Sequence, residues 1–208
     1  APAQKVAQKP ASLSFEEAAG APVAGSTAYQ GIVEEIGLKE RETVLIAGAA
    51  GGVGTMAVQV AASLGARVLG TASPRNHDYL LSLGVTEAID YHGDWVAAVR
   101  TIAPDGVDAI FDCVGGETFR HSFEAVRNGG RVVTIVAFGE EVEPGRGITH
   151  HAFSARAQQR KLEKLSEMFD SGELRVEIED VLPLEEAAKA HERVEAGHTR
   201  GKIVLRVG

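Results

Sequence analysis

The chain has 208 residues, of which 44% are apolar, so it can bury a sizeable core as one large domain or one domain with an appendage. Its formal net charge of −8 argues against a nucleic-acid partner, because phosphate contacts need clustered Lys and Arg. A single cysteine, Cys113, excludes an internal disulfide and a zinc site built from several cysteines. No stretch approaches about 18 uninterrupted apolar residues and the first residues lack an apolar signal core, so we expect a cytoplasmic protein with no membrane partner.

Residues 43–57 hold the most informative pattern, in which a β-branched strand leads through a glycine-rich turn straight into an apolar helix. Gly51, Gly52 and Gly54 carry no Cβ, so the backbone can approach a pyrophosphate, and the amides at the helix start attract its charge. The spacing departs from the dinucleotide-binding fingerprint at its first position, which holds Ala49. Taken alone, such a turn can also be a plain tight connection.

The context of the turn favours a dinucleotide site. A helix without Pro is predicted over residues 53–64, Gly65 stands at its expected C-cap, and residues 67–72 predict the next strand. A strand before the turn, a helix after it and a second strand at this distance are the context that the fingerprint requires. We therefore expect the turn to bind a dinucleotide through its backbone.

The loop after the second strand bears on which dinucleotide is bound. A carboxylate about 20 residues after the glycines would bind the ribose 2′-OH of NAD and repel a 2′-phosphate. The sequence has no acid here before Asp78, while Ser73 offers a hydrogen bond and Arg75 a forked, charged contact to a phosphate. NADPH is therefore favoured over NADH. The same residues also fit a turn and cap for a helix over residues 76–83, and the two interpretations are compatible.

Strand and helix patterns then alternate at the pitch of a βαβ series. Further strands are predicted over residues 85–91, 106–114, 131–136 and 148–153, with helices over residues 95–102 and 117–126. Together these elements predict an α/β fold with a doubly wound, six-stranded parallel sheet, whose ligand lies at the carboxyl ends of the strands near the switch in strand order.

The last third of the chain breaks this rhythm. Helices are predicted over residues 156–170 and 184–196, and strands over residues 174–181 and 202–207. These elements form an extra C-terminal part, which we expect to complete a structural unit other than the predicted sheet.

Several short motifs jointly resemble a known family. They are Ala-Ala-Gly-Gly-Val-Gly at residues 49–54, Leu-Gly-Ala at 64–66, Ile-Asp-Tyr at 89–91, Asp-Cys-Val-Gly-Gly at 112–116, Gly-Gly-Arg-Val-Val at 129–133 and Gly-Lys-Ile-Val-Leu at 201–205. With them the chain resembles the zinc-independent medium-chain dehydrogenases/reductases, and among these the NADPH:quinone oxidoreductases. The resemblance implies three parts: residues 1–24, which lead into the cofactor domain, an NADP-binding Rossmann domain over residues 25–154, and residues 155–208, which normally complete the catalytic domain.

The resemblance also implies a set of cofactor contacts, with Thr27 on the nicotinamide side. The pyrophosphate would meet Gly51, Gly52 and Val53, and the adenosine ribose would meet Gly70 and Thr71. Ala50 and Gly54 are also expected among the cofactor contacts. The 2′-phosphate would be surrounded by Ser73, Arg75, Asn76 and Tyr91, and the nicotinamide ribose would be flanked by Cys113, Val114, Gly115, Thr134, Ile135 and Val136.

The implied reaction is hydride transfer from NADPH to a quinone or an α,β-unsaturated carbonyl, with the chemistry residing in the cofactor. The family's N-terminal catalytic domain has no counterpart in these residues, so we expect one wall of the hydride-transfer pocket to be absent and turnover to be weak or absent. A non-catalytic NADP(H)-binding module or partner subunit is the alternative. The catalytic residue stays unknown, since Tyr29, the nearest general-acid candidate, is better interpreted as a packed aromatic.

The remaining candidate groups give no prediction of a metal site. His150 and His151 fall in a predicted strand, where neighbours point to opposite faces and make a poor metal pair. Cys113 is interpreted as a small buried residue at a strand end rather than as an oxidisable thiol. The sixth strand and the tail offer sheet edges, so the sequence favours a homodimer. The other histidines fit surface or capping positions; they are His77, His92, His121, His191 and His198.

Overall fold

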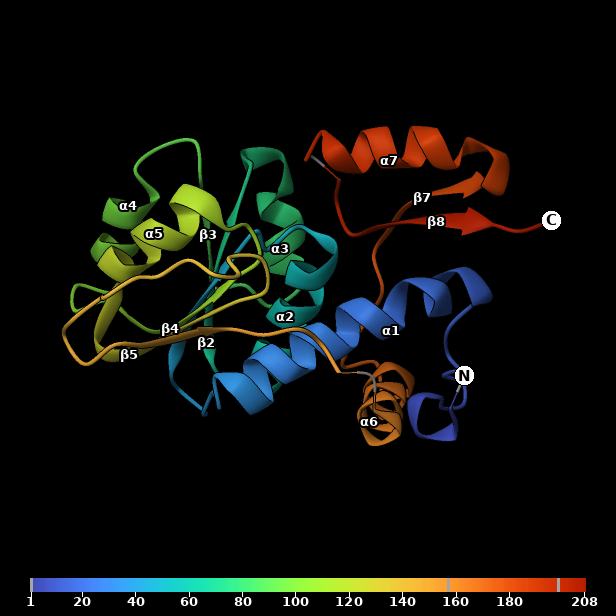
Figure 1. The fold of residues 1–208 in the computed structure, drawn as a ribbon, viewed down its shortest axis with the longest axis horizontal. Helices are drawn as coiled ribbons and strands as arrows, with labels where there is room; N and C mark the ends of the chain where they lie inside the picture. Colours follow the sequence, from blue (N-terminus) through green and yellow to red (C-terminus); the bar gives the residue numbers. More distant parts are fainter. Residues whose placement is uncertain (1, 157, 198) are drawn as a thin grey trace.

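A six-stranded parallel sheet forms the centre of the computed structural model, which describes residues 2–156, 158–197 and 199–208. Its strand order is β3-β2-β1-β4-β5-β6, and every neighbouring pair is parallel. The order reverses between β1 and β4, which makes this the switch point of a doubly wound fold. The predicted six-stranded Rossmann architecture is therefore confirmed (Figure 1). The strands are β1 (Thr43–Ala47), β2 (Arg67–Ala72), β3 (Glu87–Asp90), β4 (Val107–Asp112), β5 (Val126–Thr134) and β6 (Thr149–Ala152).

Helices cover both faces of this sheet (Figure 1). One face packs against α1 (Phe15–Tyr29), α2 (Gly52–Ser63), α3 (His77–Ser82) and α6 (Gln159–Asp170). The other face packs against α4 (Trp95–Ile102) and α5 (Gly116–Ala125). Short helical segments lie at η1 (Ala3–Lys5), η2 (Gln30–Glu35, a π-helix that continues α1), η3 (Pro74–Asn76) and η4 (Leu184–Glu186).

The strands send alternate side chains into two separate cores, as their two-residue period requires. On β1, Val44 and Ile46 enter the core beneath α1 and α2, whereas Leu45 enters the core beneath α4 and α5. A strand with apolar residues on both faces must be covered on both sides, which is how parallel sheets are buried. The glycine-rich turn after β1 is thus held at the middle of the molecule.

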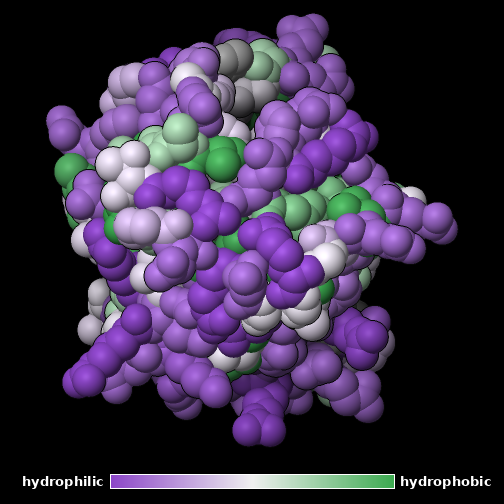
Figure 2. Space-filling view, turned by 90° about the vertical axis from the view of Figure 1, so that its left-hand side faces the viewer, coloured by the Kyte–Doolittle hydropathy of each residue, from purple (hydrophilic) through white to green (hydrophobic). Residues whose placement is uncertain are grey.

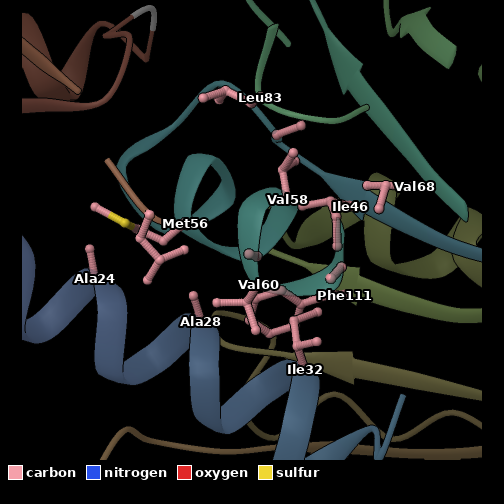
Figure 3. Packing of buried hydrophobic residues seen from close by; sticks show 14 of the residues in the cluster. Ala24, Ala28, Ile32, Ile46, Met56, Val58, Val60, Val68, Leu83 and Phe111 are labelled. Carbon is pink, nitrogen blue, oxygen red and sulfur yellow. The ribbon is translucent and has the colours of Figure 1, made fainter. Parts of the chain in front are cut away.

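Small residues let the first core close tightly around Phe111 of β4. Figure 3 shows Ala28 and Ile32 facing Val60 of α2 and the Phe111 ring. A Cβ on Gly31 would lie 2.5 Å from that ring, so a side chain at this position would collide with Phe111. The approach of the α1–η2 helix to the sheet depends on this position.

Helices begin and end at the residues that local signals favour. Ser14 caps α1 by accepting the N–H of Glu17 at 3.1 Å, and the Glu17 carboxylate accepts the N–H of Ser14 at 2.8 Å, which completes a capping box. Asp94 caps α4 by accepting the N–H of Ala97 at 2.9 Å. Gly65, with a φ of +74°, follows the end of α2 as predicted.

The strand predicted over residues 174–181 is wrong at its start, because β7 spans Ile178–Pro183. The backbone of Arg175 instead forms hydrogen bonds with the side chain of Gln59, on α2. The Arg175 N–H donates to Gln59 Oε1 at 2.8 Å, and the Arg175 carbonyl accepts from Gln59 Nε2 at 3.1 Å. Leu174 and Val176 are buried in the first core. A tertiary contact thus replaces the predicted strand pairing in residues 174–177.

Two further predicted boundaries are wrong. β5 begins at Val126, inside the predicted helix over residues 117–126, and runs through Gly130, where a Cβ would overlap the Val126 side chain. α6 begins at Gln159 rather than at residue 156, because the N–H of Arg156 donates to the side chain of Gln30 at 3.1 Å. Residue 157 lies outside the described residues.

The C-terminal part forms a separate two-stranded parallel sheet of β7 and β8 (Lys202–Arg206), with α7 (Ala187–Glu195) beside it. Both strands contact α1, and Figure 1 shows them above α1, apart from the main sheet. The face that carries α4 and α5 is mostly hydrophilic, with apolar side chains in small patches (Figure 2). None of the helices in the described ranges has the length and apolar character needed to span a membrane.

Candidate functional site

The glycine-rich turn links β1 to α2 at the switch point of the sheet. Gly48 has a φ of +73°, and its carbonyl accepts the N–H of Gly51 at 3.0 Å. Thr71, on β2, holds the turn from the side, because its hydroxyl accepts the N–H of Gly48 at 3.1 Å and its carbonyl accepts the N–H of Ala49 at 3.0 Å. A Cβ on Gly54 would overlap the carbonyl oxygen of Gly48, so this glycine lets α2 approach the turn.

A crevice of about 330 Å³ opens at the carboxyl ends of β1, β2 and β4. Of the predicted residues, it is lined by Ala50, Gly51, Thr71, Ser73, Arg75, Asn76, Tyr91, Cys113 and Val114. A second cavity of about 280 Å³ continues it, sharing Gly48, Thr71, Tyr91, Val114 and Gly197 with the first. Predicted residues from segments that are far apart along the chain thus line two adjoining cavities.

Other predicted contacts do not line the crevice. Thr27 is buried in α1, where its hydroxyl donates to the carbonyl of Val23 at 2.7 Å. Gly70 lets β2 pack beneath the turn, since a Cβ there would lie 2.9 Å from the Cβ of Ala49. As ligand contacts these residues stay predictions, together with Gly52, Val53, Gly54, Gly115, Thr134, Ile135 and Val136.

The end of the crevice after β2 and β3 is polar. Arg75 is the charged side chain among the lining residues described, and none of them is a carboxylate. Asn76 Nδ2 lies 3.4 Å from the Ser73 hydroxyl, so Ser73 and Asn76 are held together across η3. Tyr91 stacks on His92 with 4.3 Å between ring centroids. This rim presents a cation, hydroxyls and an amide, which suits a phosphate.

Asp90 is a carboxylate near this rim that the sequence reasoning did not weigh. The backbone N–H of His92 and then its ring hold the pKa of Asp90 below its ordinary value. The ring nitrogen Nδ1 of His92 lies 2.6 Å from Asp90 Oδ1. Asp90 is therefore engaged with His92 and does not line the crevice.

Cys113 directly follows β4, as its interpretation as a residue at a strand end predicts, but it is half-buried and lines the crevice, so the prediction of a buried residue is wrong in that respect. Burial, followed by the nearby Asp112 carboxylate, raises the pKa of the Cys113 thiol far above its ordinary range. A thiol with a raised pKa stays protonated and is a poor nucleophile.

The connection between α7 and β8 forms a wall of the crevice that the sequence reasoning missed. Gly197 and Thr199 line the hollow. The N–H of Gly201 donates to the carbonyl of Ala50 at 2.9 Å, and Gly201 forms a β-bridge with Gly51. The signal that could have located this wall is the glycine pair 197 and 201 just before the final strand. Trp95 and Thr118, which line the second cavity, were also missed.

The two neighbouring histidines point apart, as predicted. His150 Nε2 lies 2.8 Å from the carbonyl oxygen of Val142, whereas His151 Nε2 lies 2.9 Å from Glu35 Oε2. In the part of the chain that the structure describes, no three His, Cys, Asp or Glu side chains gather in a way that could hold a metal ion. His198 lies outside the described residues. Tyr29 is half-buried and packs against the first core.

Comparison with known proteins identifies the family. The sequence profile described as zinc-binding dehydrogenase matches residues 83–205. The chain belongs to the zinc-binding dehydrogenase family. This family match confirms the resemblance to the medium-chain dehydrogenases/reductases.

Individual relatives match almost the whole chain. It is 30% identical to a probable zinc-binding oxidoreductase, mitochondrial, of Arthroderma benhamiae, over 98% of this chain and 66% of that protein. It is 33% identical to 2-methylene-furan-3-one reductase of Solanum lycopersicum, over 96% of this chain and 49% of that protein. The quinone oxidoreductase from Coxiella burnetii superposes with a TM-score of 0.90 at 35% identity, over 97% of this chain and 64% of that one. The chain thus spans from 49% to 66% of the length of these relatives.

Proposed function

We propose that this chain binds NADP(H) in the crevice at the switch point and forms the cofactor-binding part of an NADPH-dependent oxidoreductase. The observation that carries the proposal is the hollow itself, which joins the glycine-rich turn to a rim holding Arg75 and no carboxylate among the described lining residues. The turn fits a diphosphate, because Gly51 leaves the backbone bare where Ala50 and Gly51 line the hollow.

The rim supports NADPH over NADH. A dinucleotide site specific for NAD places a carboxylate beside the ribose 2′-OH, where it would repel a 2′-phosphate. Here Ser73, Arg75 and Asn76 occupy the loop after β2, and Tyr91 closes the far side. A guanidinium and two polar side chains stabilise a dianionic phosphate by charge-assisted hydrogen bonds.

When bound, NADPH supplies a hydride to an electrophilic carbon of the substrate. The residues of this chain bind the cofactor, orient it and exclude water from one side. We propose a quinone or an α,β-unsaturated carbonyl as the acceptor, supported by the named activities of two relatives, a quinone oxidoreductase and a 2-methylene-furan-3-one reductase. Tyr29 is not proposed as the general acid, because its half-buried side chain packs against the first core.

Binding and turnover measured on the same sample test the proposal. Calorimetry should show NADPH binding more tightly than NADH, and steady-state NADPH oxidation with 1,4-benzoquinone or an enone should be weak or absent from these residues alone. Tight binding with no rate above background in any longer form of the protein would instead support a non-catalytic NADP(H)-binding module. A chain that binds neither dinucleotide would show the proposal to be wrong.

The quaternary state belongs to the same proposal. β6 is the last strand of the main sheet and pairs on one side with β5. An open strand edge is commonly covered by a second copy, so we propose a homodimer. Size-exclusion chromatography with light scattering should give twice the mass of the chain, and a monomer at all concentrations would contradict this. The cytoplasmic location and the three-part division of the chain also stay predictions, although the proposed boundary at residues 24–25 lies within α1.

A further inference from the structure

Asp112 and Thr134 stand side by side at the carboxyl ends of two neighbouring strands. Each is the last residue of its strand, and they are register partners in the parallel pair of β4 and β5. Both are buried, with exposed fractions of 0% and 1%. The Thr134 hydroxyl donates to Asp112 Oδ2 at 2.7 Å. A carboxylate and a hydroxyl are thus joined beneath the two loops that leave these strands.

The Asp112 carboxylate holds the first of these loops. Its Oδ1 accepts the N–H groups of Val114 and Gly115, each at 3.0 Å, and its Oδ2 accepts the N–H of Gly115 at 3.1 Å. A buried carboxylate is costly unless donors surround it, and here the donors are backbone groups of the loop. Any movement of residues 113–115 would therefore leave the carboxylate short of partners.

The Thr134 hydroxyl holds the second loop in the same way. While donating to Asp112, its Oγ1 accepts the N–H of Val136 at 3.2 Å and the N–H of Ala137 at 3.1 Å. The two loops also pack on each other, because a Cβ on Gly115 would lie only 3.0 Å from the Val136 side chain. One linked set of hydrogen bonds therefore fixes both loops relative to each other.

These loops carry two apolar side chains that the core does not cover. Val114 is 52% exposed and lines the crevice, and Val136 is 45% exposed. Asp112 and Thr134 line neither cavity. Their hydrogen bonds are satisfied within the protein, so they reach a ligand only through the loops they hold.

We propose, on the basis of the proposed NADP(H) function, that Asp112 and Thr134 are positioning residues for the nicotinamide half of the cofactor. They fix the separation of the two loops so that Val114 and Val136 flank the nicotinamide ribose. Thr134 acts through the backbone of its loop, which differs from the direct ribose contact expected from the sequence. The adenosine half depends on other residues, from η3 and the end of β3.

The test compares two ligands on matched variants. NADPH carries both halves of the cofactor, whereas 2′,5′-ADP carries only the phosphorylated adenosine half. Thr134→Val removes the hydroxyl and leaves two backbone N–H groups without their acceptor, so we expect NADPH to bind at least about tenfold more weakly. The affinity for 2′,5′-ADP should change less than about twofold, because its contacts lie outside the two loops. Thr134→Ser keeps the hydroxyl and should restore NADPH binding.

A second variant and a spectroscopic readout complete the design. Asp112→Asn replaces an acceptor oxygen by an NH₂ group, so it should weaken NADPH binding as Thr134→Val does. It should also shift the fluorescence emission of bound NADPH. This variant keeps the test possible if Thr134→Val does not fold. An equal loss for both ligands, or an unchanged affinity for NADPH, would overturn the inference. A parent protein that binds neither ligand would instead disprove the proposed function on which the inference rests.

Discussion

The N–H of Gly201 donates to the carbonyl oxygen of Ala50 at 2.9 Å, which attaches the connection between α7 and β8 to the glycine-rich turn. Gly201 adopts a φ of +67°, and a Cβ there would lie 2.6 Å from the Glu177 Cβ. The connection between α7 and β8 is therefore attached to the crevice at a glycine, where the structure leaves no room for a side chain.

Gly201→Ala should detach this wall of the crevice. The added methyl group collides with Glu177, and the φ of +67° is unfavourable for alanine, so we expect a lower urea midpoint and weaker NADPH binding. Gly172→Ala is the matched control, because Gly172 has a φ of +81° and no atom within 4 Å of its Cβ position. The control should cost only about 1–2 kcal/mol of unfolding free energy and leave NADPH affinity unchanged. Equal effects of the two variants would show that Gly201 matters only for its backbone conformation.

Arg75→Ala tests the choice of dinucleotide. Loss of a charged hydrogen bond to the 2′-phosphate should weaken NADPH binding by about 1–3 kcal/mol, while NADH, which has no 2′-phosphate, should bind as before. Arg67→Ala removes an exposed charge from the opposite end of β2 and serves as the control. Calorimetric titrations of the parent and the two variants with both dinucleotides give the six affinities needed. An equal loss for NADPH and NADH would remove Arg75 from the 2′-phosphate site.

The carboxyl group of Asp108 should make the stability of the fold depend on pH. Burial acts to raise its pKa, but the N–H of Thr43 at 2.7 Å and the Arg127 guanidinium at 2.7 Å outweigh it and hold the pKa below its ordinary value. A folded-state pKa below the unfolded value contributes stability above the unfolded pKa, and this stability is lost as the pH falls through the folded pKa.

Asp108→Asn should therefore destabilise the protein at neutral pH by about 1 kcal/mol, with the difference from the parent disappearing below the folded pKa. Urea unfolding at a series of pH values from 7 downward measures this. NADPH affinity is the control, since Asp108 lies near the start of β4, away from the crevice at its carboxyl end. A difference that persisted at low pH would contradict the assignment.

Gln59→Leu should destabilise the attachment of residues 174–177 to α2. The substitution keeps an apolar body but leaves both the N–H and the carbonyl of Arg175 without the Gln59 partner, which should cost about 1–3 kcal/mol. Gln159→Leu is the matched control, because Gln159 is the exposed first residue of α6, and this variant should change the urea midpoint little. A midpoint shift no larger than that of the control would show that solvent replaces the Gln59 bonds.

Local patterns predicted the parts of the fold that depend on local physics. The alternation of β1, the glycines after it and the Gly65 C-cap each act within a few residues, so the sequence alone located the turn, α2 and the rim at Arg75. Where a distant partner decides, prediction failed. The Arg175 backbone forms hydrogen bonds with the Gln59 side chain and not with a neighbouring strand. Gly201 forms a hydrogen bond with Ala50, which lies far from it in the sequence. No periodicity in the tail indicates either contact.

The hydrogen-bonded pair of Asp112 and Thr134 is a third kind of feature, which the sequence predicted only in part. Asp112 was part of the Asp-Cys-Val-Gly-Gly motif, inside a strand predicted over residues 106–114, and Thr134 was expected as a cofactor contact inside a strand predicted over residues 131–136. Their shared hydrogen bonds depend on the register that pairs Asp112 with Thr134, which follows from the sheet and not from either strand by itself.

The seating of Gly197, Thr199 and Gly201 on the glycine-rich turn has a consequence for biosynthesis. A ribosome makes the turn and all the strands of the main sheet long before it makes this wall. A nascent chain can therefore assemble its sheet while its crevice still lacks one side, and a bound dinucleotide gains the contacts of this wall only after Gly201 has emerged.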